Sequence, residues 1–289
     1  MVDNSMERRV DAGDRLPVIL LILTKNEEKA LPAALEHIAM FQECFVVDSE
    51  STDATREIAE SLGATVVDFS WDRRYPKKKE WAQVNVPSSL EWCFFLDADE
   101  RLTEDLIREI RSTVHENTLD ALDSPLAYKF AGKFLRHGHR VKKRALVRRS
   151  AARWPRPDDL GVKTMWEVEG HYQPLMDGKV GAGKASLIHD DPDGFFEYFS
   201  RHNRYSDWEA HLAVLGSKVD GRGGQGLRAS LVGMSRRIPL RGVVYFLYAF
   251  VLRRGFLDGR AGLDYAIAHA FYYWQIQLKA REIFRAQGR

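Results

Sequence analysis

The sequence has 289 residues, of which 45% are hydrophobic and 29% are charged, with a formal net charge of +2. This composition is typical of a globular protein, and the length suits one large domain or one domain with an appendage. Acidic and basic residues nearly balance and no nucleic-acid recognition motif occurs, so we expect no nucleic-acid partner. The first sixteen residues lack the apolar core of a signal peptide. The longest apolar run, 243–252, is shorter than the ~20 residues that span a bilayer, which makes a cytoplasmic location the expectation.

The first third of the chain alternates strand and helix patterns. Residues 18–23 (VILLIL) form a continuous apolar run, as in a parallel strand that is covered on both faces. Further strands are predicted over 44–47, 64–68 and 92–96, and helices over 27–40, 53–62 and 103–114. Such β-α-β repeats predict an α/β fold with a doubly wound, mainly parallel sheet, which binds ligands at the carboxyl ends of its strands.

Individual residues mark the ends of these elements. Thr103 is expected to cap the third helix, Ser51 or Thr52 to cap the second, and Gly63 to close it. Cys44 and Cys93 lie inside apolar runs and are expected to be buried, unpaired core residues.

The rest of the chain differs in character. Residues 125–190 favour shorter strands and loops, whereas helical patterns follow Phe195, at 229–254 and 261–285. Five glycines within 216–228 indicate a flexible loop or hinge. The domain prediction is therefore a tail over 1–15, a sheet domain over 16–200 and a helical, amphipathic module over 201–289.

Polar residues follow three of the predicted strands. They are Thr24-Lys25-Asn26-Glu27, the stretch from Asp48 to Asp53, and Asp97-Ala98-Asp99. Because residues two apart share a face of an extended segment, Asp97 and Asp99 can point the same way. Two such carboxylates suit Mg²⁺ or Mn²⁺ bound jointly with a diphosphate. The alternative is a strand end whose acids only favour the next helix.

These stretches resemble a known family. LILTKNEEKALPAALEHI, FVVDSESTDATREIAESLGA and EWCFFLDADERLTEDL look like the nucleotide-sugar domain of family-2 glycosyltransferases, which have the GT-A fold. Three later stretches are similar to bacterial transferases that add glucose or a related sugar to the lipopolysaccharide core; they are GKFLRHGHRVKKRALVRRSAARW, LIHDDPDGFFEYFSRHNRYSDWEA and LRRGFLDGRAGLDYAIAHAFYYW. The resemblance implies a metal-dependent, inverting enzyme that moves a sugar from a UDP-sugar donor to a lipid-linked or lipopolysaccharide acceptor.

The resemblance also implies roles for single residues. Asp48 matches the acid that binds the nucleotide base, and Thr24, Asn26, Glu27 and Ser51 line the same pocket. Asp97 would face the ribose or sugar, and Asp99, with Asp97, would hold Mn²⁺ or Mg²⁺. His189 would complete the metal shell or merely close a strand. Arg144 would reach the diphosphate, and Lys79, with Lys77 and Lys78, would supply charge at 73–85, where the family's usual pattern is absent.

The family's inverting members use a carboxylate as general base on the acceptor hydroxyl. In this chain the usual His-Glu motif is replaced by MWEVEGHYQP, which offers Glu167 and Glu169, with His171 nearby. Their spacing puts both carboxylates on one face of a strand, so the pattern does not decide between them. Glu169 is the preferred candidate.

Two regions raise the question of a membrane. Eleven Lys and Arg lie between Lys129 and Arg156, where there is no acid. The tract is a solvated face, a nucleic-acid site, or a surface for anionic lipids or an acidic glycolipid, and we favour the last. Leu263, Ile267, Phe271, Trp274 and Leu278 trace one helix face. Such spacing usually marks a core face. The apolar run 243–252, however, is framed by Arg236, Arg237 and Arg241 on one side and by Arg253 and Arg254 on the other. We therefore favour a helical extension that lies peripherally at the cytoplasmic face of the inner membrane.

Two rival functions remain at this point. A nucleotidyltransferase shares such a sheet, but it would want a glycine-rich phosphate loop after the first strand, where TKNEEKA has no glycine. A membrane-docked scaffold without turnover would be favoured by loss of a metal-binding acid, and both acids are present.

Overall fold

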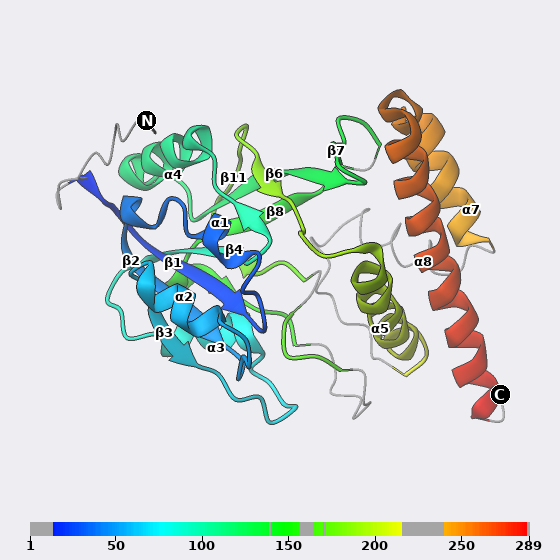
Figure 1. The fold of residues 1–289 in the computed structure, drawn as a ribbon, viewed down its shortest axis with the longest axis horizontal. Helices are drawn as coiled ribbons and strands as arrows, with labels where there is room; N and C mark the ends of the chain where they lie inside the picture. The colour runs from blue at the N-terminus through cyan, green and yellow to red at the C-terminus, as the bar shows by residue number, and fades with distance from the viewer. Residues whose placement is uncertain (1–13, 139, 157–164, 170–171, 216–239, 288–289) are drawn as a thin grey trace.

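The computed structural model describes residues 14–138, 140–156, 165–169, 172–215 and 240–287. A ten-stranded sheet runs through the molecule in the order β3-β2-β1-β4-β8-β6-β12-β5, with β11 and β7 also paired to β6 (Figure 1). The strands are β1 Leu16–Thr24, β2 Phe41–Asp48, β3 Thr65–Asp68, β4 Trp92–Asp97, β5 Glu100–Arg101, β6 Ala121–Phe130, β7 Lys133–Phe134, β8 Lys142–Arg148, β11 Val180–Ala182 and β12 Leu187–His189. A separate two-stranded sheet pairs β9 Ala152–Arg153 with β10 Leu175–Met176.

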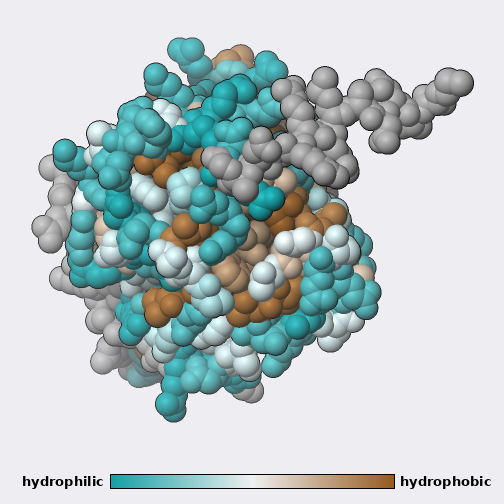
Figure 2. Space-filling view, turned by 90° about the vertical axis from the view of Figure 1, so that its left-hand side faces the viewer, coloured by the Kyte–Doolittle hydropathy of each residue, from teal (hydrophilic) through white to brown (hydrophobic). Residues whose placement is uncertain are grey.

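The helices cover both faces and one end of this sheet (Figure 1). They are α1 Leu31–Ala34, η2 Ile38–Met40, α2 Thr55–Ser61, α3 Lys78–Asn85, α4 Glu104–Glu116, η3 Arg149–Ala151, α5 Phe195–Val214, α7 Arg241–Phe246, η4 Leu247–Leu252, η5 Gly255–Asp258 and α8 Gly259–Ala286. Figure 2 views the molecule from the side away from α8, where hydrophilic side chains surround smaller apolar patches near the centre.

The predicted parallel sheet is confirmed for its first half. Strands β3, β2, β1 and β4 run parallel, and the pairing sets Thr24 opposite Asp48 and Leu23 opposite Asp97. Three polar strand ends therefore meet at one edge. Beyond β4 the sheet is mixed, because β8 is antiparallel to both β4 and β6.

β1 is buried on both faces, as its apolar run predicts. Leu20 and Ile22 belong to one apolar cluster, and Ile19 and Leu21 to a second cluster on the opposite face. Cys93 and Cys44 are both buried and unpaired, as expected.

Two predicted helix ends are confirmed, and one predicted helix is wrong. Thr103 Oγ1 accepts a hydrogen bond from Leu106 N (3.1 Å) and caps α4, and Gly63 ends the turn after α2 with φ +88°. A single helix over 27–40 is wrong. The chain forms only the short α1 and the 3₁₀ turn η2, because Pro32 lacks an N–H and is tolerated only in the first turn of a helix. Helix α3 was not predicted at all.

The C-terminal helices pack against the sheet at one end of the molecule (Figure 1). The rings of Phe130 on β6, Tyr198 on α5 and Tyr265 on α8 form one contact cluster. The predicted domain boundary at residue 200 falls inside the continuous helix α5. The tail through residue 13, His171 and the glycine-rich segment 216–228 lie outside the described residues. Within the described part of the chain, no helix is both long and apolar enough to cross a bilayer.

Replacing Thr103 with alanine removes the cap of α4 and the hydrogen bond that its hydroxyl donates to Ser186 O. We expect Thr103→Ala to lower the free energy of unfolding by about 1 kcal/mol in urea denaturation. Thr103→Ser keeps the hydroxyl and should stay close to the wild type. Equal stability of the alanine variant and the wild type would show that the cap contributes nothing.

Candidate active site

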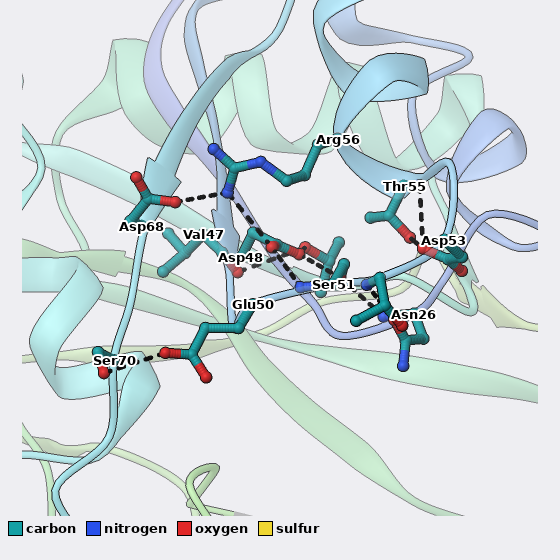
Figure 3. A network of polar contacts seen from close by, with 12 residues as sticks. Asn26, Val47, Asp48, Glu50, Ser51, Asp53, Thr55, Arg56, Asp68 and Ser70 are labelled. Carbon is teal, nitrogen blue, oxygen red and sulfur yellow. Dashed lines mark hydrogen bonds and ion pairs between the residues drawn. The ribbon is translucent and has the colours of Figure 1, made fainter.

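Asp48 organises the ends of β1 and β2 (Figure 3). Its carboxylate accepts hydrogen bonds from Thr24 Oγ1 (2.9 Å), Ser51 N (2.9 Å) and Ser51 Oγ (2.5 Å), and it lies 3.4 Å from a guanidinium nitrogen of Arg56. Burial raises the pKa of Asp48, but the bonds from Ser51 and Thr24 outweigh it and leave the pKa below its usual value. The carboxylate is therefore held ionised in one orientation, as a group that recognises a ligand donor must be.

Asn26 and Glu27 join the first-strand loop to the same network. Asn26 N donates to Ser51 Oγ (2.8 Å), and Asn26 Oδ1 accepts from Thr52 N (2.8 Å). Asn26 has φ +57°, a left-handed conformation that asparagine tolerates better than most residues. Glu27 N donates to Thr55 Oγ1 (2.7 Å). The structure thus brings together Thr24, Asn26, Glu27, Asp48 and Ser51, as predicted.

Two buried lysines neutralise Asp97. Lys143 Nζ lies 2.8 Å from Asp97 Oδ2 and also bonds Glu100, while Lys79 Nζ lies 3.2 Å from Asp97 Oδ1. Burial raises the pKa of Asp97, but Lys143 and Lys79 together hold it well below its usual range. Asp97 N also donates to Glu100 Oε2 (2.9 Å). Lys79 therefore pairs with Asp97 in this structure. The role of Lys143 was not predicted, because in the sequence it is one member of a long basic tract.

Asp99 and His189 are brought together from distant parts of the sequence. β12 ends at His189, which pairs with Glu100 of β5, and His189 Nδ1 lies 3.5 Å from Asp99 Oδ1. A backbone hydrogen bond also joins the two segments, because Asp190 N donates to Asp99 O (2.9 Å). The ring of Tyr128 stacks on His189 with centroids 4.4 Å apart. His189 thus faces the acid, as one of its two predicted roles requires.

The acids at this edge of the sheet affect the pKa of Glu27. Burial raises the pKa of Glu27 to about 8, and nearby Asp99 and Asp193 add to the shift. Asp191 and Asp193 precede α5 and pair with Arg201. These two acids were also missed, although the acidic run DDPD after His189 carried a signal.

Glu167 and Glu169 do not share a strand face, because both lie in a loop. Glu169 is buried, and its carboxylate accepts from Lys79 N (2.9 Å) and Glu80 N (2.8 Å) at the start of α3. Glu167 keeps a partly exposed carboxylate near Lys78 Nζ (3.4 Å) and Lys25 Nζ (3.7 Å). Lys78 Nζ also donates to Thr24 O (2.5 Å), which places Glu167 beside the end of β1.

Arg144 is directed away from these groups. Its guanidinium forms a two-point ion pair with Asp123 (2.8 and 3.1 Å) and donates to Pro174 O (2.9 Å). Arg144 and Lys143 are neighbours on β8 and point to opposite faces, so it is Lys143 that reaches the end of β4.

The residues present suit a hard divalent cation at Asp99 and His189. A carboxylate oxygen and an imidazole nitrogen are both ligands of Mn²⁺, and a nucleotide diphosphate with water completes such a shell. In the described ranges no cluster of three or more His, Cys, Asp and Glu side chains has metal-binding geometry. A nucleotide diphosphate would therefore have to supply part of the coordination of a bound cation.

Comparison with known proteins identifies the family of the chain. Residues 19–169, just over half of the chain, match the model of "Glycosyl transferase family 2". The lipopolysaccharide core biosynthesis glycosyltransferase LpsC of Rhizobium meliloti is 30% identical over 221 residues, 71% of this chain and 74% of that protein. An uncharacterized glycosyltransferase of Rickettsia typhi is 26% identical over 269 residues, 91% of this chain and 86% of that protein.

A solved structure shares the fold. The mannosyltransferase of Pyrobaculum calidifontis, determined with GDP-Man and Mn²⁺, aligns with a TM-score of 0.50 and 13% identity over 93% of this chain and 88% of its own. The chain belongs to glycosyltransferase family 2 and is a nucleotide-sugar glycosyltransferase with a GT-A fold.

Proposed function

We propose that the enzyme is a metal-dependent, inverting hexosyltransferase that moves a sugar from a UDP-sugar to a lipid-linked or lipopolysaccharide acceptor. The observation that carries the proposal is the meeting of Asp99 and His189 at the sheet edge where the Asp48 network also lies. A base-binding acid and a metal-binding pair at one edge suit the two ends of a nucleotide diphosphate. The 30% identical relative named for lipopolysaccharide core biosynthesis supports the acceptor class.

On the nucleotide side, Asp48 accepts an N–H of the uracil ring, with Thr24 and Ser51 fixing its carboxylate. Because these two hydroxyls and Ser51 N already hold the carboxylate, donor binding needs little reorganisation. On the sugar side, Asp97 lies next to the metal pair, and Lys79 and Lys143 fix its position.

Asp99 and His189 would hold Mn²⁺ or Mg²⁺. The bound ion supplies positive charge against the diphosphate that leaves. The presence of Mn²⁺ with GDP-Man in the structural relative supports this dependence. Asp99 and His189 contribute one oxygen and one nitrogen ligand, and the Tyr128 ring holds the imidazole plane in place.

Glu167 is the better candidate for the general base. A base must reach the acceptor hydroxyl, remove its proton and let the oxygen attack the anomeric carbon opposite the departing diphosphate. Glu169 is buried and bound to two backbone N–H groups, whereas Glu167 is accessible and lies beside Lys78 and Lys25. We therefore assign Glu169 to the capping of α3.

Removing the metal acid should uncouple nucleotide binding from metal. A thermal-shift titration of the wild type with UDP, GDP, CDP and ATP should show a UDP shift that requires Mn²⁺, because ligands of the native state raise its stability. At ligand one hundredfold above its Kd this effect is about 2.7 kcal/mol. In Asp99→Ala the Mn²⁺-dependent part should disappear while the unliganded fold stays intact.

The matched control is Asp177→Asn, which alters an exposed acid whose ion pair, among the described residues, is with Arg153. It should titrate like the wild type. Unchanged metal dependence in Asp99→Ala would overturn the metal assignment, and absence of a shift with every diphosphate would count against a donor site of this kind.

The two glutamates should separate catalysis from stability. Glu167→Gln should bind UDP normally and lose at least about a hundredfold in transfer of labelled sugar to lipopolysaccharide or lipid-linked acceptors. Glu169→Gln should lose about 1 kcal/mol or more of unfolding free energy, since the amide replaces one of the two accepting oxygens with an NH2 group, which cannot accept from an N–H. Normal transfer by Glu167→Gln together with a stable, inactive Glu169→Gln would reverse the assignment.

The raised pKa of Glu27 predicts a pH dependence of the metal-free enzyme. Since the folded state holds this proton up to about pH 8 and the unfolded chain releases it near its usual pKa of 4.5, Glu27 lowers stability as the pH rises through that window. Glu27→Gln should therefore gain at least about 1 kcal/mol relative to the wild type between about pH 5 and pH 8. Parallel stability profiles of the two proteins would contradict it.

A further inference from the structure

The outer face of the C-terminal helices is apolar. On α7 and η4, Val243, Val244, Leu247, Val251 and Leu252 are exposed, by 45% to 73%. On α8 the exposed apolar side chains recur at helical spacing, and they are Ile267, Phe271, Trp274 and Leu278. The predicted apolar stripe of α8 thus points outward from Ile267 onward.

The two sets form one surface because α7 and α8 lie against each other (Figure 1). A Cβ on Gly242 of α7 would come within 2.4 Å of Ala270 O and 3.5 Å of Trp274 Cβ. The Arg241 guanidinium lies over the Tyr273 ring at 4.2 Å. The close approach at Gly242 sets helix α7 beside Trp274. We call the exposed apolar residues of α7, η4 and α8 together the apolar surface.

A cationic hollow borders the apolar surface. It has a volume of about 240 Å³ and is lined by His137, Gly138, Arg140, Leu252, Arg253 and Arg254. The backbone holds its walls together, because Gly138 N donates to Arg253 O (2.9 Å) and Arg254 adopts φ +58°. Leu252, exposed by 73%, belongs both to the hollow and to the apolar surface.

Among the described residues, no carboxylate balances the charge of the hollow. Within the described ranges, the guanidinium groups of Arg140, Arg253 and Arg254 form no ion pair with a carboxylate. The nearby Asp258 is buried and accepts from Arg136 N, His137 N and His137 Nδ1. Across 240–287 there are seven Arg and Lys and only three acids. An anion is therefore the expected ligand of the hollow.

We propose that the apolar surface docks on an anionic phospholipid bilayer, with Arg140, Arg253 and Arg254 binding a lipid phosphate in the hollow. Apolar and aromatic side chains framed by arginines suit the interface of a bilayer, where rings and hydrocarbon enter and guanidinium groups meet headgroups. The proposal commits to lipid because the unpaired positive charge and the exposed hydrocarbon adjoin at Leu252. It is independent of the donor and acceptor proposed above.

The buried face of α8 connects to His189 through the ring of Tyr128. Tyr128 stacks on His189 and contacts Tyr265 of α8, with ring centroids 5.3 Å apart. A helix resting on the membrane would thus stand one aromatic ring away from His189.

The test is flotation of the full chain, without nucleotide or metal, on vesicles of phosphatidylcholine alone or mixed with phosphatidylglycerol. We expect binding to the mixed vesicles that weakens with salt and is not abolished by moderate inorganic phosphate. Arg140→Glu and Arg254→Glu should each reduce binding about fivefold or more. Arg108→Glu on α4, at the far side of the sheet, is the matched control and should bind like the wild type (Figure 1).

A second measurement reports how deeply Trp274 enters the bilayer. Vesicles with brominated acyl chains should quench tryptophan fluorescence in the wild type and distinctly less in Trp274→Phe, because Trp274 lies on the apolar surface. The Mn²⁺-dependent UDP shift should be unchanged in every variant, which separates failure of docking from failure of the donor site. Equal binding to both vesicle types, or loss with free phosphate alone, would overturn the proposal. So would a wild-type dimer that Leu247→Asp dissociates and that binds no vesicle.

Discussion

The buried ammonium of Lys143 between Asp97 and Glu100 is the interaction on which the site depends. Carboxylates gathered behind a buried strand repel one another, and leaving such charges unpaired in the interior is costly. Lys143 comes from β8 and Lys79 from α3, so the second half of the sheet and a helix are tied to the end of β4. With Asp97 and Glu100 satisfied in this way, Asp99 alone of the three acids is turned toward His189. Asp97 and Glu100 thus stabilise the fold, whereas Asp99 is left to face a ligand.

Helix α3 makes further charged contacts, which hold the opposite side of the site in place. Glu169 binds the first N–H groups of the helix, where a negative charge also suits the helix dipole. The helix then directs Lys78 to Thr24 O and Glu167, and Lys79 to Asp97. The three lysines at 77–79 therefore bind Asp97, Glu167 and backbone carbonyls before they bind any substrate. This is a physical reason for the departure of 73–85 from the family pattern, because side chains committed to the interior cannot follow the usual donor contacts.

Local signals predicted the parts of the fold that depend on local chemistry. The apolar run of β1, the cap at Thr103 and the polar residues after β1, β2 and β4 were readable because each depends on neighbours in sequence. What escaped prediction depends on distant partners. α3 needs a carboxylate from Glu169, Arg144 turns to Asp123, and Lys143 looks like any other member of a basic tract until β8 is placed beside β4. The motif did not decide between Glu167 and Glu169, since the burial of Glu169 and its bonds to the start of α3 leave no mark in the local pattern.

Helix α8 shows how the same amphipathic pattern can bury the opposite face. A stripe of large apolar residues on a helix usually faces the core. In α8 the buried side is made largely of small residues and tyrosines, including Gly262, Ala266, Ala268 and Tyr265, and Gly242 lets α7 approach its backbone. Small residues allow close helix packing, so the large side chains are left outside. A contiguous apolar face of this kind is uncommon on a protein surface that meets only water. The pattern therefore argues for a covered surface. The arginines beside Leu252 form no ion pair with a carboxylate in the described part of the chain, which argues that what covers the surface carries negative charge.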